Sequence, residues 1–300
     1  MTTGISESAV QDPLGALVEI LPDEPSGERT EAERPTSQRR AQGALRWLLR
    51  LLSLTVVLVG WQLLVSHRVD LWVRFSKLPA PSDVAAEFNR QLHLGRFYRD
   101  LAASMQRILI GFSLATLAGV TAGLAVGRSK VASDLLRPII EMVRPIPAIA
   151  WVPVAILAFP TNEQGIIFIT FLAALFPVIV STQHAVHALP NVWEEAARTM
   201  GANRWVVLFR VVLPGVLPGI FAGLSVAMGI GWICVISAEM ISGQFGIGYY
   251  TWKSYGLINY PGVIVGMLSI GILGLASAAA IETAGRRCTR WLPRNVRRRP

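Results

Sequence analysis

The chain contains several apolar runs long enough to cross a lipid bilayer, and this feature constrains its fold more than any other. About 18 apolar residues in a row suffice for a membrane-spanning helix. Hydrophobic residues make up 52% of the chain and charged residues 16%, below the usual share in soluble domains. Only helices and closed barrels satisfy their backbone inside lipid, and these runs lack the alternation of barrel strands. We therefore predict an all-α, polytopic membrane protein.

The apolar runs divide into six predicted membrane spans. Their approximate bounds are Leu45–Ser66, Ser104–Val126, Pro138–Phe159, Gln164–His187, Gly215–Met240 and Tyr260–Thr283. The third span contains Pro145, Pro147 and Pro153, each of which removes an N–H donor, so we predict that it is bent or broken. Between the first two spans, the segment from Pro81 begins like a short interfacial helix.

Two glycine series at four-residue spacing predict close helix packing, because small residues on one face let helices approach. These are Gly119, Gly123 and Gly127 in the second span, and Gly215, Gly219 and Gly223 in the fifth.

Changes in composition predict four parts of the chain. Residues 1–42 are polar and read as a disordered cytoplasmic tail, and residues 43–100 as the first span with an external interfacial segment. Residues 101–285 form the core domain, and residues 286–300 a basic cytoplasmic tail. Six spans place both termini on one side, and the seven arginines from Arg286 onward indicate the cytoplasm. The net charge of +9 follows the same rule, so we predict contact with membrane lipid and not with nucleic acid.

The residues that would support catalysis or metal binding are sparse. Cys234 and Cys288 form neither a disulfide framework nor a metal-ligand spacing, and His184 and His187 have no ligand partners nearby. The stretch "GLAVGRSK" lacks the lysine of a phosphate-binding loop, and no other stretch matches that motif. We therefore predict no enzyme activity, no cofactor and no metal.

The polar stretch Glu194–Pro214 lies between the fourth and fifth spans. Its pattern predicts a short helix, a turn with positive φ at Gly201, and a second short helix before the membrane helix restarts at Pro214. Apolar side chains fall on one face of each short helix: Val192, Trp193, Ala196, Ala197 and Met200, then Trp205, Leu208, Phe209 and Val212. Two interpretations fit: a knob that docks into a groove of a partner, or an amphipathic interfacial loop.

This stretch resembles the EAA motif of permeases from binding-protein-dependent ATP-binding cassette (ABC) importers. The matching residues are Glu195, Ala196, Ala197, Gly201, Val211, Leu213 and Pro214, with Val211 in place of the commoner isoleucine. The stretches "RPIPAIAWVPVAILAF", "FPVIVSTQHAV" and "AEMISGQFGIGYYTW" resemble permeases for nitrate, cyanate, bicarbonate, taurine and sulfonates. The resemblance covers about Leu101 to Ala284.

The resemblance implies a permease subunit in a bacterial inner membrane that forms the translocation path for a small anion. Its EAA loop would form coupling helices for a separate ATP-binding subunit, which hydrolyses the ATP. A solute-binding protein and a second permease copy would complete the transporter. A self-contained channel or secondary transporter is the alternative, but the sequence has no clear inverted repeat and few membrane carboxylates.

Polar and aromatic residues inside the spans are candidates for the path. We select Trp151, Trp232, Ser237 and Glu239. Each has a plainer alternative, because tryptophans also anchor helices at the interface and Glu239 could accept a hydrogen bond from the turn that follows it. Glu141 and Arg144, three residues apart, form either a cytoplasmic gate or a structural ion pair.

Overall fold

The structure is a computed structural model that describes residues 36–67, 77–242 and 244–291. The chain divides into two units, residues 1–60 and 61–300, and helix α2 (Thr36–Ser66) runs through the boundary. Residues 36–42, which we assigned to the tail, are helical and belong to α2. The rest of that predicted tail lies outside the described residues. The apolar part of α2, Trp47–Ser66, is long enough to span a membrane.

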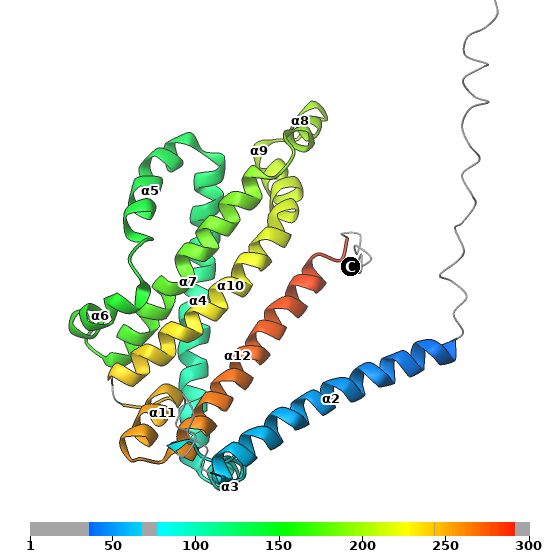
Figure 1. Ribbon diagram of the computed structural model, residues 1–300. Coiled ribbons are helices and arrows are strands. Elements are labelled where there is room, and N and C mark those ends of the chain that lie inside the picture. The colour runs from blue at the N-terminus through cyan, green and yellow to red at the C-terminus, as the bar shows by residue number, and fades with distance from the viewer. Residues whose placement is uncertain (1–35, 68–76, 243, 292–300) are drawn as a thin grey trace, which may run out of the picture. The chain divides into compact units, whose positions relative to one another are not determined.

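All regular secondary structure in the described residues of the second unit is helical and matches the predicted all-α class (Figure 1). Its helices are α3 (Pro81–Leu92), α4 (Gly95–Arg128), α5 (Lys130–Val143), η3 (Ala148–Trp151), α6 (Val152–Ala158), α7 (Asn162–His187), α8 (Asn191–Thr199), α9 (Arg204–Val207), η4 (Leu208–Val212), α10 (Leu213–Ser242), α11 (Ile247–Gly256) and α12 (Tyr260–Cys288). The predicted interfacial helix is α3, with proline in its first turn.

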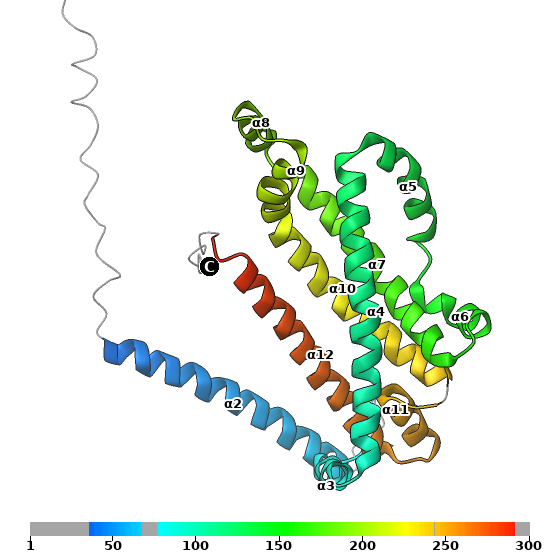
Figure 2. The same cartoon turned by 180° about the vertical axis from the view of Figure 1, so that it is seen from behind.

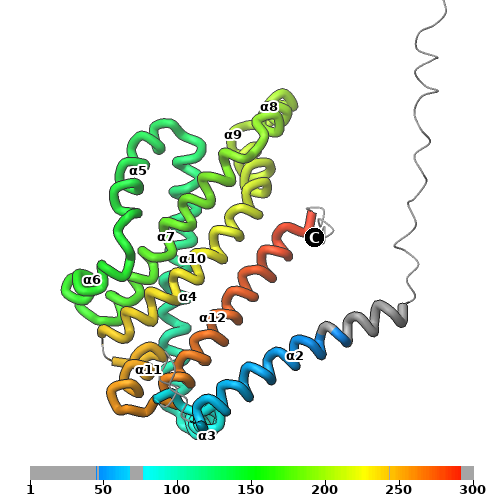
Figure 3. The backbone as a smooth tube through the Cα atoms, in the orientation of Figure 1, coloured from blue at the N-terminus to red at the C-terminus, as the bar shows by residue number. Residues whose placement is uncertain are grey.

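The predicted third span is broken, as its prolines indicate. The helix α5 and the pair η3–α6 are bent by 82° at the break, which Figure 3 shows as a sharp change in the path of the tube. Pro145 and Pro147 lie in the break itself, where neither can donate to a helix. The described residues therefore hold five helices able to span a membrane, or six if the broken pair counts as one.

Helix α7 lies between α4 and α10 and packs against both (Figure 2). The glycines of both series face it, except Gly215, which lies against Leu189 and Trp193. A Cβ at Gly119 or Gly123 of α4 would overlap Val178 or Thr182, and a Cβ at Gly219 of α10 would overlap Ala185. The close helix packing predicted from the glycine spacing is therefore confirmed.

The two ends of this three-helix group carry different structures. At one end lie α8, α9 and the turn between α4 and α5, and at the other lie α3 and α11 (Figure 1). We call them the α8 end and the α11 end.

Candidate functional site

The turn at the α8 end has local causes for each of its bends. Helix α8 ends at Thr199, and Gly201 follows with φ +83°, a conformation that glycine adopts without steric cost. Asn203 then starts α9, because its Oδ1 accepts hydrogen bonds from the N–H groups of Trp205 at 3.1 Å and Val206 at 2.9 Å. The predicted glycine turn is confirmed, and the asparagine cap is a feature that we did not predict.

The second short helix continues into the membrane helix. We predicted that the membrane helix restarts at Pro214, but the structure has one continuous helical segment, Arg204–Ser242. Its π turn, Leu208–Val212, directly precedes the first turn of α10, which contains Pro214. The wider π turn changes the hydrogen-bond register just before the residue that lacks an N–H, so the helix passes the proline without a break.

Large apolar side chains at the α8 end are exposed. Trp193 is 52% exposed, Met200 82%, Trp205 62% and Phe209 59%. The rings of Trp205 and Phe209 stack at 6.2 Å, so they present one flat aromatic surface. Exposed apolar patches of this kind mark interaction surfaces. We call these four side chains the apolar knob.

An apolar groove lies beside the knob. It has a volume of about 720 Å³ and lies between α8, the start of α10 and the C-terminal end of the described chain. Its lining includes Trp193, Ala196, Ala197, Met200, Arg210, Val211, Pro214, Gly215, Pro218 and Trp291. Six residues of the predicted motif or apolar faces therefore line one concave surface: Trp193, Ala196, Ala197, Met200, Val211 and Pro214.

Two neighbouring glutamates at the α8 end behave differently. Glu194 accepts hydrogen bonds from Arg128 at 2.6 and 3.1 Å, which ties α8 to the end of α4. Glu195, the first residue of the predicted motif, is exposed and forms no ion pair with the described residues. Glu194 thus holds the loop in place, and Glu195 is free to contact another molecule.

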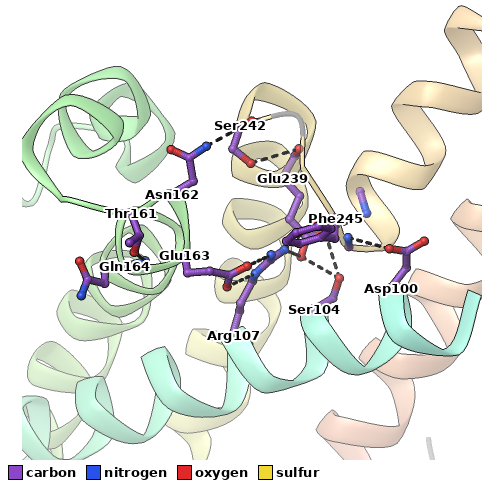
Figure 4. Close-up of polar contacts among 12 residues, drawn as sticks. Asp100, Ser104, Arg107, Thr161, Asn162, Glu163, Gln164, Glu239, Ser242 and Phe245 are labelled. Atoms are coloured by element: carbon purple, nitrogen blue, oxygen red, sulfur yellow. Dashed lines mark hydrogen bonds and ion pairs between the residues drawn. The ribbon is translucent and has the colours of Figure 1, made fainter. Parts of the chain in front are cut away.

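A buried polar network joins four segments at the α11 end (Figure 4). Arg107 of α4 is 1% exposed, and its Nη1 donates to Glu239 of α10 and to the carbonyl oxygen of Phe245, both at 2.7 Å. Its other nitrogens donate to Glu163 at the start of α7. Ser104, one turn before Arg107, donates to Glu239 at 2.7 Å. A single guanidinium therefore connects α4, α7, α10 and the segment leading to α11.

The same network holds the N-terminus of α11. The N–H of Gly248 donates to Glu239 at 2.9 Å, and the N–H of Gly246 donates to Asp100 at 3.2 Å. Carboxylates are favourable there, because the first N–H groups of a helix lack partners within it and carry partial positive charge. The hydrogen bond from the turn is the alternative that we predicted for Glu239. Glu239 is fully buried, so its predicted place on a translocation path does not fit.

Arg107 is not among the residues that we selected from the sequence. One signal could have found it, since an arginine inside an apolar span is costly and is paired or functional. Its partner Glu163 lies 56 residues away, and Glu239 lies 132 residues away. No sequence spacing reveals such a pairing.

The other predicted path residues lie in separate places. Trp232 is 5% exposed, and its indole N–H donates to Ser277 of α12 at 2.9 Å. It therefore connects α10 to α12, and its burial does not fit the predicted place on a translocation path. Ser237 is partly exposed and donates to the carbonyl oxygen of Ile233 in its own helix. Trp151 is partly buried in η3, directly after the break, and its indole N–H has no partner among the described residues.

The predicted pairing of Glu141 with Arg144 is absent from the structure. Glu141 contacts Nε of Arg137 at 2.7 Å, one helical turn earlier. Arg144 is the C-terminal cap of α5 and forms no ion pair with Glu141, whose carboxylate is paired with Arg137. Arg144 instead lines a cavity of about 430 Å³ between the break, α7 and α10.

Within residues 36–67, 77–242 and 244–291, no group of three or more His, Cys, Asp or Glu side chains is placed to hold a metal ion.

Comparison with known proteins identifies the family. Residues 115–291 match the model for the binding-protein-dependent transport system inner membrane component. The match covers more than half of the chain and includes α8, the apolar knob and α10. The chain belongs to this family.

Several curated relatives of this family align over most of the permease chain. The nitrate import permease protein NrtB of Synechocystis is 31% identical over 233 residues, which cover 74% of this chain and 82% of NrtB. The bicarbonate transport system permease protein CmpB of Synechococcus elongatus is 30% identical over 285 residues, which cover 89% of this chain and 99% of CmpB.

The fold is also similar to that of a solved transporter. A chain of the MetNI methionine ABC transporter, in an inward-facing conformation, aligns with a TM-score of 0.52 and 20% identity over 66% of this chain and 96% of that chain. The family membership makes this chain a membrane-located transport permease, as predicted, and not itself an enzyme.

Proposed function

We propose that this permease is the membrane-spanning subunit of an ATP-driven importer for a small inorganic oxyanion such as nitrate or bicarbonate. The observation that carries this proposal is the similarity to a nitrate and a bicarbonate permease over 74% and 89% of the chain. Taurine, alkanesulfonates and cyanate are further candidate substrates, because the sequence stretches that we compared are similar across these permeases.

The α8 end is the proposed coupling surface for the ATP-binding subunit. The motif residues there are Glu195, Ala196, Ala197, Gly201, Val211, Leu213 and Pro214. Three features support this proposal: the exposed apolar knob, the unpaired carboxylate of Glu195 and the groove of about 720 Å³. Short helices that present apolar side chains fit a groove in a partner. The continuous segment Arg204–Ser242 would carry a displacement of this surface into the membrane domain.

The proposed orientation follows from that surface. The α8 end faces the cytoplasm, with both termini on that side, and the α11 end faces the solute-binding protein. Residues 101–285 form the permease domain, residues 43–100 precede it, and two copies pair around the path. Trp151 and Ser237 are the candidates that we keep for the path, since both are at least partly accessible.

Native mass spectrometry of the purified complex tests the coupling surface. The chain is expressed with its ATP-binding subunit, with and without Glu195→Arg combined with Gly201→Trp. We expect two permease copies with two ATP-binding subunits, and loss of the ATP-binding subunits in the variant. Glu282→Arg with Gly271→Trp is the matched control, because both residues are exposed on α12.

Retention of the ATP-binding subunits in the first variant would contradict the proposed surface. A stable chain that never binds an ATP-binding subunit would favour a channel or secondary transporter instead. A panel of anions, tested for ATP hydrolysis that depends on the binding protein, then tests the substrate class.

A further inference from the structure

The cavity beside the helix break is the strongest candidate for a binding site that the proposed function leaves unassigned. Its lining includes Arg144, Ile146, Pro147, Ala148, Leu172, Ala173, Phe176, Pro177, Val180, Ser181, Val226 and Ile230. The α7 residues lie near the middle of a 26-residue helix, and the α10 residues near the middle of a 30-residue helix. The cavity therefore lies near the middle of the membrane spans.

The backbone around the cavity requires water or protein beside it. Arg144 to Pro147 are exposed and interrupt the helix, and irregular backbone at membrane depth occurs only where it is buried in protein or lines a water-filled cavity. Pro177 of α7 also lines the cavity and cannot donate to the carbonyl oxygen of Ala173, which lies in the same wall. The break after α5 and the proline in α7 therefore both leave backbone groups without helical hydrogen bonds beside the same cavity.

Arg144 is the charged side chain among the lining residues, and no carboxylate lines the cavity with it. It forms no ion pair or hydrogen bond with the described side chains, since Glu141 contacts Arg137 instead. An arginine inside a membrane span is costly unless it is paired or faces water. The guanidinium therefore lies beside the cavity with its donors available.

We infer that Arg144 is the anion-binding residue of the translocation path, and that the cavity beside it is a transient site for a planar oxyanion. A guanidinium matches the two oxygens of a carboxylate-like or nitrate-like edge with two parallel hydrogen bonds. The volume of about 430 Å³ holds roughly fourteen waters at about 30 Å³ each, so a small oxyanion enters with part of its hydration shell. Apart from Ser181, the other side chains of the wall are apolar, so few groups hold the anion and it can leave the site again.

This inference rests on the proposed function, because it names the residue that selects the anion. Its test uses the complete transporter, with ATP-binding subunit and binding protein, in cells and in lipid nanodiscs. Uptake of isotopically labelled nitrate and bicarbonate is measured beside ATP hydrolysis stimulated by the binding protein. Arg144→Gln is compared with Arg144→Lys, and Arg137→Gln is the control for loss of an arginine from the same helix.

We expect Arg144→Gln to lower anion uptake about 10- to 100-fold, the loss of one charge-assisted hydrogen bond pair, while ATP hydrolysis stays stimulated. Arg144→Lys keeps most of the uptake because the charge remains, and Arg137→Gln matches the wild type. Uptake by Arg144→Gln within twofold of the wild type overturns the inference. A wild-type transporter that hydrolyses ATP but carries none of the anions overturns the proposed substrate class, and that failure is visible before any variant is tested.

A second measurement keeps the inference testable if Arg144→Gln does not accumulate. Arg144→Cys is placed in a background with Cys234→Ala and Cys288→Ser and is labelled with charged thiol reagents. Restoration of uptake by a reagent that adds an ammonium, but not by one that adds a sulfonate, supports the assignment. Absence of labelling, or equal effects of both charges, overturns it.

Discussion

The two ends of the permease domain differ in how their side chains are partnered. At the α11 end, a buried arginine, three carboxylates and the first N–H groups of α11 form one network. At the α8 end, two tryptophans, a phenylalanine and a methionine are more than half exposed, and Glu194 ties the loop to Arg128 of α4. The polar network is complete within one chain, whereas the apolar knob has no partner among the described residues.

This difference separates two kinds of stability. Removal of one member of a buried charged network lowers the stability of the fold strongly, because the remaining buried charge has no partner. A substitution in an exposed surface patch changes stability little, because the side chain there contacts water in the folded and the unfolded chain. Stability measurements should therefore respond to the α11 end, and assembly measurements to the α8 end.

The largest effect is expected from Arg107→Leu. This change leaves Glu239 fully buried without its positive partner, which costs about 3–5 kcal/mol of unfolding free energy. Thermal unfolding of the purified chain in detergent measures it. Arg137→Leu removes an exposed, hydrated ion pair and should change the melting temperature far less. Equal melting temperatures for the two variants would contradict the importance of burial at the α11 end.

Gly246→Val should have the next largest effect. Gly246 has φ +116° and ψ 166°, a region that only glycine commonly occupies, so strain alone costs about 1–3 kcal/mol. The added side chain would also overlap the Glu239 carboxyl group. Gly271→Val is the control, because no other atom lies within 4 Å of a Cβ there. A Gly246→Val protein as stable as that control would rule out the close contact between this turn and Glu239.

Asn203→Ala should produce a smaller loss of stability, confined to the α8 end. Removal of the side-chain cap exposes two N–H groups of α9, at a cost of about 1 kcal/mol. Hydrogen exchange followed by mass spectrometry should show faster exchange in α9 and unchanged exchange in α11. Asn203→Asp retains an acceptor and should match the wild type, whereas faster exchange at both ends would show that the ends are coupled.

The smallest effect is a pH dependence of stability at Glu87 of α3, which also lies at the α11 end. Burial raises the pKa of this carboxyl, but hydrogen bonds from Arg90, Gln91 and Asn259 outweigh burial and hold the pKa below 4.5. The carboxylate therefore stabilises the fold above pH 4.5, and this stabilisation is lost as the pH falls through the lowered pKa. The difference in melting temperature between wild type and Glu87→Gln should shrink on acidification. A constant difference would mean that the charge is irrelevant.

The sequence predicted the membrane fold well because its signals are local. Length and hydropathy predicted the spans, the prolines predicted the break before η3, and the spacing of small residues predicted the helix contacts of α4 and α10. The positive φ at Gly201 was also predictable, since a polar, alanine-rich helix ends there.

The incorrect predictions for site residues share one cause: the spacing of residues in the sequence does not determine which side chains form hydrogen bonds or ion pairs. Trp232 was placed on a path although Ser277, 45 residues later, takes its indole N–H. Glu141 had charged neighbours at two helical spacings, and the end of α5 at Arg144 decided between them. The network around Arg107 required three helices to be assembled before any member had a partner.

The glycine contacts of α7 have a consequence for motion during transport. Close-packed interfaces exchange between discrete arrangements and do not deform smoothly. Since α7 packs on α4 and α10 through atoms that leave no room for a methyl group, we expect these three helices to move as one body. Spin labels within them should keep constant distances when ATP binds. Arg144 lies at the end of α5, outside these three helices, whereas α7 and α10 supply most of the other residues that line its cavity. We therefore expect the cavity to change shape when this body tilts.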